Sequence, residues 1–178
     1  LNLRIAVMSG RKIYNFALIG AGRMGARWAE VLKMSKSLNV LAIADKNLPD
    51  AKKLSLRFKN CEAFSDLRRL LRMKNIDAVV IAVPHKFLAP LSIEALEAGK
   101  HVFSEKPAGV SSRELADAVR MAKKRQVSYM VGFNHRFHPS YLLAKKIVLA
   151  KKIGEILFIR AKYGFGGRLG YEKEWRQN

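Results

Sequence analysis

Glycine residues near the amino end have the spacing of a phosphate-binding turn. Gly20, Gly22 and Gly25 form a Gly-x-Gly-x-x-Gly pattern between an apolar run and a helical stretch. The first glycine permits a tight turn, the second lets backbone amides approach a pyrophosphate, and the third allows the helix to pack closely on the strand. Since amides at a helix N-terminus attract anions, this context favours a dinucleotide site over a purely structural turn. The residues assigned to it are Gly20, Ala21, Gly22, Arg23, Met24 and Gly25.

An acidic residue, Asp45, ends the second apolar run, about 20 positions beyond Gly25. Its carboxylate can accept hydrogen bonds from the adenosine ribose hydroxyls of a dinucleotide, which favours NAD. A 2′-phosphate would meet this negative charge, but Lys46 beside it could offset part of the repulsion, so NADP stays the alternative. The alternative interpretation is that Asp45 is only a turn residue at the end of a strand.

The segment Glu105-Lys106-Pro107 follows the fifth apolar run. In doubly wound folds, loops at this edge of the sheet contact ligands. A lysine there could hydrogen-bond a substrate hydroxyl or help move its proton, and the proline could fix the loop through a cis bond. Taken alone, the segment is explained more simply as a surface ion pair before a turn proline.

The elements that must position these residues follow from alternating apolar runs and helical stretches, which predict an α/β fold with a parallel sheet covered on both faces. Helix signals are Pro49 in an opening turn, Ser65, and Ser111 or Ser112 at starts, with Gly99 at an end. The strands are expected at residues 16–20, 40–45, 61–64, 78–83, 101–104 and 128–133.

The pattern changes after residue 133, where we expect a helix at 140–150, a strand at 155–163 and a glycine-rich loop. Residues 14–136 are therefore predicted to form a nucleotide-binding domain, and 137–178 the incomplete beginning of a second α/β domain. Residues 1–13 are predicted to be an extension, with Met8 as a possible true start and an added edge strand at 1–7 as the alternative.

The composition excludes several classes of protein. With 178 residues, 49% hydrophobic and 27% charged, the chain resembles a folded globular protein, and no apolar run is long enough for a membrane span. The single Cys61 allows no internal disulfide or cysteine metal site, so we expect a cytoplasmic protein without a metal. Although the net charge is +20, basic residues are scattered along helices without a nucleic-acid-binding motif. Solvated helix faces, or attraction for an anionic dinucleotide, explain the charge without a specific nucleic-acid partner.

The motifs together, and in this order, resemble the Gfo/Idh/MocA oxidoreductases, a family named for glucose-fructose oxidoreductase and inositol dehydrogenase. The resemblance covers nearly everything after Tyr14 and also rests on residues 76–84, 95–102 and 132–137. It implies a Rossmann domain followed by an α/β domain with a large open sheet, which forms a homo-oligomer in the full-length family. It also implies hydride exchange between NAD(P) and a sugar, cyclitol or related secondary alcohol.

By this resemblance Lys106 is the catalytic lysine, and it also contacts cofactor and substrate. Glu105, Asn134 and Arg136 are expected around the nicotinamide and substrate. The assigned cofactor site extends to Val83 and Pro84 at the end of the fourth run. In the tail, a Gly-Gly-Arg loop and a Lys-Glu-Trp-Arg segment resemble one branch of the family. They suggest Arg168, Lys173 and Arg176 as substrate residues.

Two departures from the family pattern matter. Leu88 stands where members commonly place a histidine, and the nearby His85 is either a cofactor contact or an ordinary loop histidine. The family's later Asp and His pair has no counterpart before Asn178, so we expect this chain to bind cofactor at best. His138 is assigned to helix entry rather than catalysis, and His101 to a strand.

The leading hypothesis is an NAD(P)-dependent dehydrogenase acting on a sugar-like alcohol. The alternatives are a non-catalytic dinucleotide-binding regulator, and an NAD-dependent glycosidase of the same family.

Overall fold

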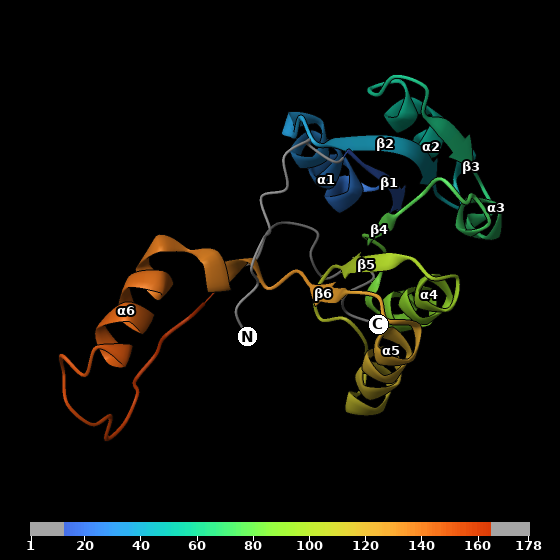
Figure 1. Cartoon of the computed structure of the whole chain (residues 1–178). Coiled ribbons are helices and arrows are strands. Elements are labelled where there is room, and N and C mark those ends of the chain that lie inside the picture. Colours follow the sequence, from blue (N-terminus) through green and yellow to red (C-terminus); the bar gives the residue numbers. More distant parts are fainter. Residues whose placement is uncertain (1–12, 165–178) are drawn as a thin grey trace. The chain divides into compact units, whose positions relative to one another are not determined.

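The computed structural model describes residues 13–164. Contacts divide the chain into two units, one ending at Gly132 and one beginning at Phe133, and each is considered by itself (Figure 1). The boundary expected at residues 136 and 137 stays a prediction. The proposed start at Met8 and the alternative edge strand at 1–7 lie outside the described residues, as do Arg168, Lys173 and Arg176.

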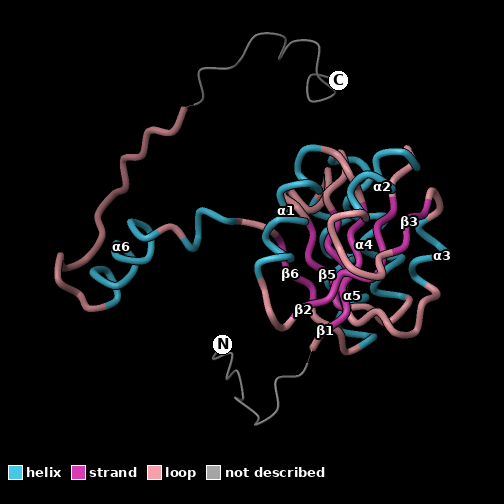
Figure 2. The backbone as a smooth tube through the Cα atoms, turned by 90° about the horizontal axis from the view of Figure 1, so that it is seen from above, coloured by secondary structure: helices cyan, strands magenta, loops and turns pink. Residues whose placement is uncertain are grey.

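The first unit is built on a sheet of six parallel strands in the order β3-β2-β1-β4-β5-β6. The strands, magenta in Figure 2, lie among the cyan helices. The chain starts in the middle and winds outward in both directions, which confirms the doubly wound arrangement. Each expected strand is present, with ends that shift by at most two residues. The strands are β1 (Tyr14–Ile19), β2 (Leu38–Ala44), β3 (Glu62–Phe64), β4 (Ala78–Ile81), β5 (His101–Ser104) and β6 (Tyr129–Val131).

Helices cover both faces of this sheet, because successive strand residues point to opposite sides. On β1, Leu18 packs in one core cluster, whereas Ala17 and Ile19 pack in the other. Both faces of the central strands are buried, which explains why their sequences are continuously apolar. The Leu18 side is covered by α1 (Arg23–Met34) and α2 (Leu48–Ser55), and the other side by α3 (Leu67–Leu71), α4 (His85–Glu97) and α5 (Ser112–Arg125).

The helix ends follow from local sequence. Ser111 caps α5 by accepting a hydrogen bond from the Glu114 amide at 3.2 Å, as the start signal predicts. Gly99 follows α4 with φ at 75°, a left-handed conformation that glycine adopts without strain. Pro49 lies in the first turn of α2, as the start signal predicts. Asp66, not Ser65, caps α3, since the Asp66 side chain accepts from the Arg68 amide.

Close contact between α1 and β1 depends on two glycines. A Cβ atom on Gly25 would lie 1.9 Å from the carbonyl oxygen of Gly20, and one on Gly20 would lie 2.3 Å from the carbonyl oxygen of Ala82. Real side chains do not approach backbone atoms so closely. α1 can therefore begin directly against the end of β1 only because Gly25 lacks a side chain, whereas the lack of one at Gly20 lets the turn pass close to Ala82 after β4.

The second unit contains the 3-10 helix η1 (Asn134–Phe137) and the helix α6 (Pro139–Leu149). His138 caps α6 by accepting a hydrogen bond from the Ser140 amide at 3.3 Å, which confirms its role at the helix entry. The strand predicted at 155–163 is wrong: in the described chain, residues 156–164 have no regular secondary structure and pair with no strand. An apolar run of strand-like composition cannot form a ladder without a neighbouring strand to accept its hydrogen bonds.

Lys100 is a charged side chain inside the first unit, with 6% of its surface exposed. Its Nζ donates hydrogen bonds to the carbonyl oxygens of Met73 and Ile76, both at 2.8 Å. It thereby holds the turn after α3 against the start of β5. Burial lowers the pKa of Lys100, and the carboxylate of Asp77 offsets part of this effect.

We predict that Gly25→Ala lowers the free energy of unfolding by about 3 kcal/mol, because its Cβ forces α1 away from β1. Gly22→Ala is the matched control, since a Cβ there has nothing within 4 Å. It should change stability by less than about 1 kcal/mol. Urea denaturation followed by circular dichroism measures both, and equal losses would show that the close approach is not what Gly25 supplies.

We also predict that the wild-type chain gains stability relative to Lys100→Met as the pH rises toward 10.5, the usual lysine value. Since the folded pKa lies below the unfolded one, the unfolded state binds more protons between the two values, and raising the pH therefore favours folding. Thermal melts of both proteins across this range measure the difference. Parallel pH profiles would show that Lys100 titrates normally in the fold.

Candidate functional site

The carboxyl ends of the strands form the edge at which the predicted cofactor residues lie. The backbone N–H groups of Gly20, Ala82 and Glu105 donate to carbonyls of the adjoining strands β2, β1 and β4, at 2.8, 2.8 and 2.9 Å. These residues follow β1, β4 and β5 directly, so the hydrogen bonds place them in one row. Ligands bind in doubly wound folds at this edge, where the strand order reverses between β1 and β4.

The backbone N–H groups in the first turn of α1 have no acidic side chain beside them. An α-helix leaves its first amides without intrahelical acceptors, and Gly22, the N-cap, makes no side-chain cap. No acidic residue lies in the first turn. The space at Gly22 is open, and Arg23 is exposed beside it. The turn therefore fits a pyrophosphate, whose charge the helix N-terminus would stabilise.

Asp45 is tied to this turn. One oxygen of its carboxylate accepts from the Ala21 amide at 2.7 Å, and the other accepts from the Asn47 amide at 2.8 Å. The side chain thus joins the end of β2 to the glycine-rich loop, while Lys46 beside it is exposed. Its turn role and its proposed ribose role are compatible, since each carboxylate oxygen can accept more than one hydrogen bond.

Glu105 and Lys106 follow β5 in the same row. The bond between Lys106 and Pro107 is cis, as considered from the sequence. The Glu105 carboxylate accepts from the indole Nε1 of Trp28 at 2.8 Å and from the Lys106 amide at 3.2 Å. In the described part of the chain, the Lys106 ammonium is exposed and has no hydrogen bond or ion pair, so it is not paired with Glu105. An unpaired ammonium at this edge can donate to a ligand.

The remaining predicted residues divide between the two units. Val83 and Pro84 are half-buried after β4, and Pro84 is the N-cap of α4. His85 is the first residue of α4 rather than a loop residue. Asn134 and Arg136 are exposed residues of η1 in the second unit.

Leu88 lies on the buried face of α4 and is fully buried in the core. The histidine that the family commonly has at this position is therefore replaced by a packing residue.

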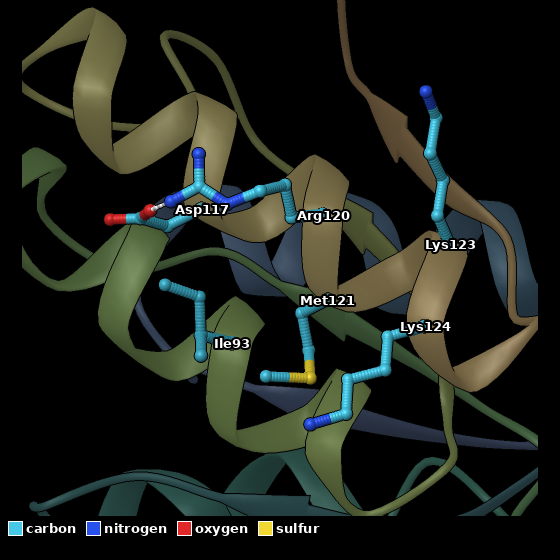
Figure 3. A pocket seen from close by; sticks show the side chains of 6 residues that line it. All are labelled: Ile93, Asp117, Arg120, Met121, Lys123 and Lys124. Carbon is cyan, nitrogen blue, oxygen red and sulfur yellow. Dashed lines mark hydrogen bonds and ion pairs between the residues drawn. The ribbon is translucent and has the colours of Figure 1, made fainter.

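A hollow of about 670 Å³ lies between α4 and α5, away from this edge (Figure 3). It involves the second half of α5, which leads back to the amino ends of the strands. In Figure 3, Asp117 and Arg120 form an ion pair, and Ile93 and Met121 face each other from the two helices. The hollow is lined by Ile93, Asp117, Arg120, Met121, Lys123 and Lys124.

Neither a metal site nor a membrane-spanning helix is found within residues 13–164. The described side chains contain no group of three metal-binding residues, and the helices there include none long and apolar enough to cross a membrane. Burial raises the pKa of Cys61 to about 12, with a contribution from the Glu62 carboxylate, so the thiol is unreactive at neutral pH.

Sequence reasoning missed two residues of this edge. Trp28 has the spacing of a buried helix position, so its sequence context indicates packing and gives no sign of the hydrogen bond to Glu105. Asn47 donates its backbone amide to Asp45 and its side chain to Asp50, at 2.8 and 2.7 Å. A short Asp-x-Asn turn after a strand is the signal that could have revealed it.

The sheet order, the glycine-rich turn and Asp45 together define an NAD-binding Rossmann domain. Residues 14–133 match a family model described as an oxidoreductase family with an NAD-binding Rossmann fold. The chain therefore belongs to the Gfo/Idh/MocA oxidoreductase family, as the motifs suggested.

Similar proteins include enzymes whose names describe different reactions. A levoglucosan dehydrogenase from Pseudarthrobacter phenanthrenivorans is 35% identical, over 84% of this chain and 40% of its own. A 2,7-anhydro-N-acetylneuraminate hydratase from Escherichia coli is 30% identical, over 83% of this chain and 39% of its own.

A solved structure extends the comparison. Scyllo-inositol dehydrogenase from Lactobacillus casei, with bound NAD(H) and scyllo-inositol, is 29% identical with a TM-score of 0.75, covering 81% of this chain and 43% of that one. The chain thus spans about two fifths of the relatives it matches.

We predict that Asp45→Ala lowers the free energy of unfolding by about 1 to 2 kcal/mol, because two amides lose a charged acceptor at a partly exposed site. Asp45→Asn should lose less, since its side-chain oxygen can keep one of the two bonds. Urea titration measures both. An Ala variant as stable as the wild type would show that these hydrogen bonds do not hold the glycine-rich loop.

Proposed function

We propose that this chain supplies the cofactor half of an NAD-preferring dehydrogenase that acts on a sugar-like secondary alcohol. The observation that carries the proposal is the open glycine-rich turn at the N-terminus of α1, joined by Asp45 to the end of β2. Gly20 to Gly25 hold the pyrophosphate, and Val83 and Pro84 line the approach to the nicotinamide side. Bound NAD would exchange a hydride with the substrate carbon at its nicotinamide ring.

Lys106 is the proposed catalytic residue. Its exposed ammonium donates a hydrogen bond to the substrate oxygen, or, as the neutral amine, its Nζ takes up the proton as the hydroxyl becomes a carbonyl. Glu105, Asn134 and Arg136 complete the nicotinamide and substrate surroundings, with Arg168, Lys173 and Arg176 assigned to substrate.

Asp45 is the basis for preferring NAD. Its carboxylate accepts hydrogen bonds from the ribose hydroxyls but repels a 2′-phosphate. The exposed Lys46 reduces this repulsion without removing it. The preference is therefore one of degree, and NADP is a weaker ligand of the same site.

The substrate class rests on relatives. Levoglucosan and scyllo-inositol, the compounds in two of their names, are polyhydroxylated rings with secondary alcohols. The hydratase is named for the addition of water, which is not a net oxidation. It favours the second candidate, an NAD-dependent glycosidase, in which NAD acts transiently and no net NADH accumulates. We also propose that the enzyme is cytoplasmic and forms a homo-oligomer. The cytoplasmic location is favoured because a single cysteine, Cys61, suits a reducing compartment.

The test is a calorimetric titration of the purified chain with NAD and NADP. We predict saturable NAD binding, weaker NADP binding, and loss of both in Gly22→Val. The valine side chain would fill the open space that the pyrophosphate needs, without meeting any protein atom at its Cβ. Asp45→Ala should narrow the preference for NAD over NADP by about tenfold, the value of one charge-assisted contact.

Circular dichroism of Gly22→Val controls for folding. A folded variant that binds NAD as well as the wild type would place the cofactor elsewhere. No binding by a folded wild-type chain would refute the proposal. NADP binding tighter than NAD would overturn the assignment of Asp45.

A further inference from the structure

Trp28 connects the two sides of the candidate cofactor site. It lies on α1, one turn after the glycine-rich segment, and its indole Nε1 donates to Oε1 of Glu105 at 2.8 Å. The other oxygen of the same carboxylate, Oε2, accepts from the backbone amide of Lys106 at 3.2 Å. A continuous path of hydrogen bonds therefore runs from the phosphate-binding helix to the backbone of the proposed catalytic lysine.

The indole is held in place by packing. Its ring lies 4.5 Å from the ring of Phe103 on β5, edge to face at 61°. The Phe103 ring in turn fills the space over Gly132, where a Cβ would lie 3.1 Å from it. Trp28 and Phe103 both belong to the core cluster on the α1 side of the sheet. Because the ring cannot turn freely, its N–H direction is fixed toward Glu105.

The geometry gives Glu105 a structural task in addition to its proposed place beside the nicotinamide. Both of its carboxylate oxygens already accept hydrogen bonds from the protein. A carboxylate held on one side by α1 and on the other by the Lys106 amide fixes the loop between them. Packing alone would not require a donor at Trp28, since a phenylalanine could fill the same core position.

We propose that Trp28 is a positioning residue, whose indole N–H holds Glu105 and thereby sets the Lys106 backbone in register with the glycine-rich turn. The inference rests on the proposed cofactor site. Loss of this N–H leaves the pyrophosphate subsite intact and loosens the loop that meets the nicotinamide half of NAD. Binding of the two halves of the cofactor should therefore respond differently.

The experiment compares NAD with ADP-ribose, which keeps the adenosine and pyrophosphate but lacks nicotinamide. Calorimetry is performed on the chain as wild type, Trp28→Phe, Glu105→Ala and the double variant. Trp28→Phe keeps a ring against Phe103 and removes only the donor. We expect it to weaken NAD binding about tenfold, the value of one hydrogen bond to a charged group, and ADP-ribose binding by less than about twofold.

The double variant tests whether Trp28 acts through Glu105. Without Glu105, loss of the indole N–H should cost nothing more, so the double variant should match Glu105→Ala within about twofold. Additive losses, or equal weakening of both ligands by Trp28→Phe, would overturn the positioning role and leave Trp28 as a packing residue. Unchanged NAD binding in Trp28→Phe would overturn it as well.

An NMR spectrum separates this inference from the proposed function. The indole resonance of Trp28, assigned by its loss in Trp28→Phe, should shift in Glu105→Ala without any ligand. Failure to shift would overturn the hydrogen bond itself. If the folded wild type binds neither NAD nor ADP-ribose, the proposed function falls and the positioning role falls with it, while the indole shift still reports whether the two residues are joined.

Discussion

The close approach of the Gly25 backbone to the carbonyl oxygen of Gly20 is the constraint on which the site depends. A Cβ on Gly25 would stand 1.9 Å from the Gly20 carbonyl, so α1 can begin where it does only with hydrogen at that position. This fixes where the first amides of α1 point, and Asp45 then locks the loop through the Ala21 amide at 2.7 Å. The same starting point sets the rotation of α1 that carries Trp28 toward Glu105. One close approach therefore determines the start of α1, the loop that Asp45 holds and the connection to the Lys106 loop.

The basic composition has an explanation in the helices themselves. Lys123, Lys124 and Arg125 form the last turn of α5, and Glu114 lies in its first turn. Cations near a helix C-terminus and anions near its N-terminus complement the helix dipole, which makes these charges part of local stability. The first turn of α1 differs from that of α5 because it has no acidic residue, a property that α1 shares with α3, α4 and α6. What distinguishes α1 is therefore its glycine-rich start, where the space at Gly22 is open.

Sequence reasoning predicted what local chemistry determines. Strand positions followed from apolar runs, the start of α5 from Ser111, and the end of α4 from Gly99, since each signal acts within a few residues. It missed the contact of Trp28 with Glu105, 77 positions apart, because only the assembled sheet brings α1 to the end of β5. It was wrong about residues 155–163 for a related reason. Composition can show that a segment suits a strand, but pairing requires a neighbour that the pattern does not specify.

The two units differ in how well they can hold a side chain in place, and this limits what each contributes to chemistry. The first has clusters of fully buried residues around its sheet, so Glu105 and Asp45 are held by elements that are themselves packed. In the described second unit, η1 and α6 bury no residue, and Asn134 and Arg136 are exposed. Precise catalytic geometry needs rigid support, because a small displacement of a reacting group is costly. Within the described residues, the packing that can hold a side chain in place therefore belongs to the first unit, where it supports Asp45 and Glu105.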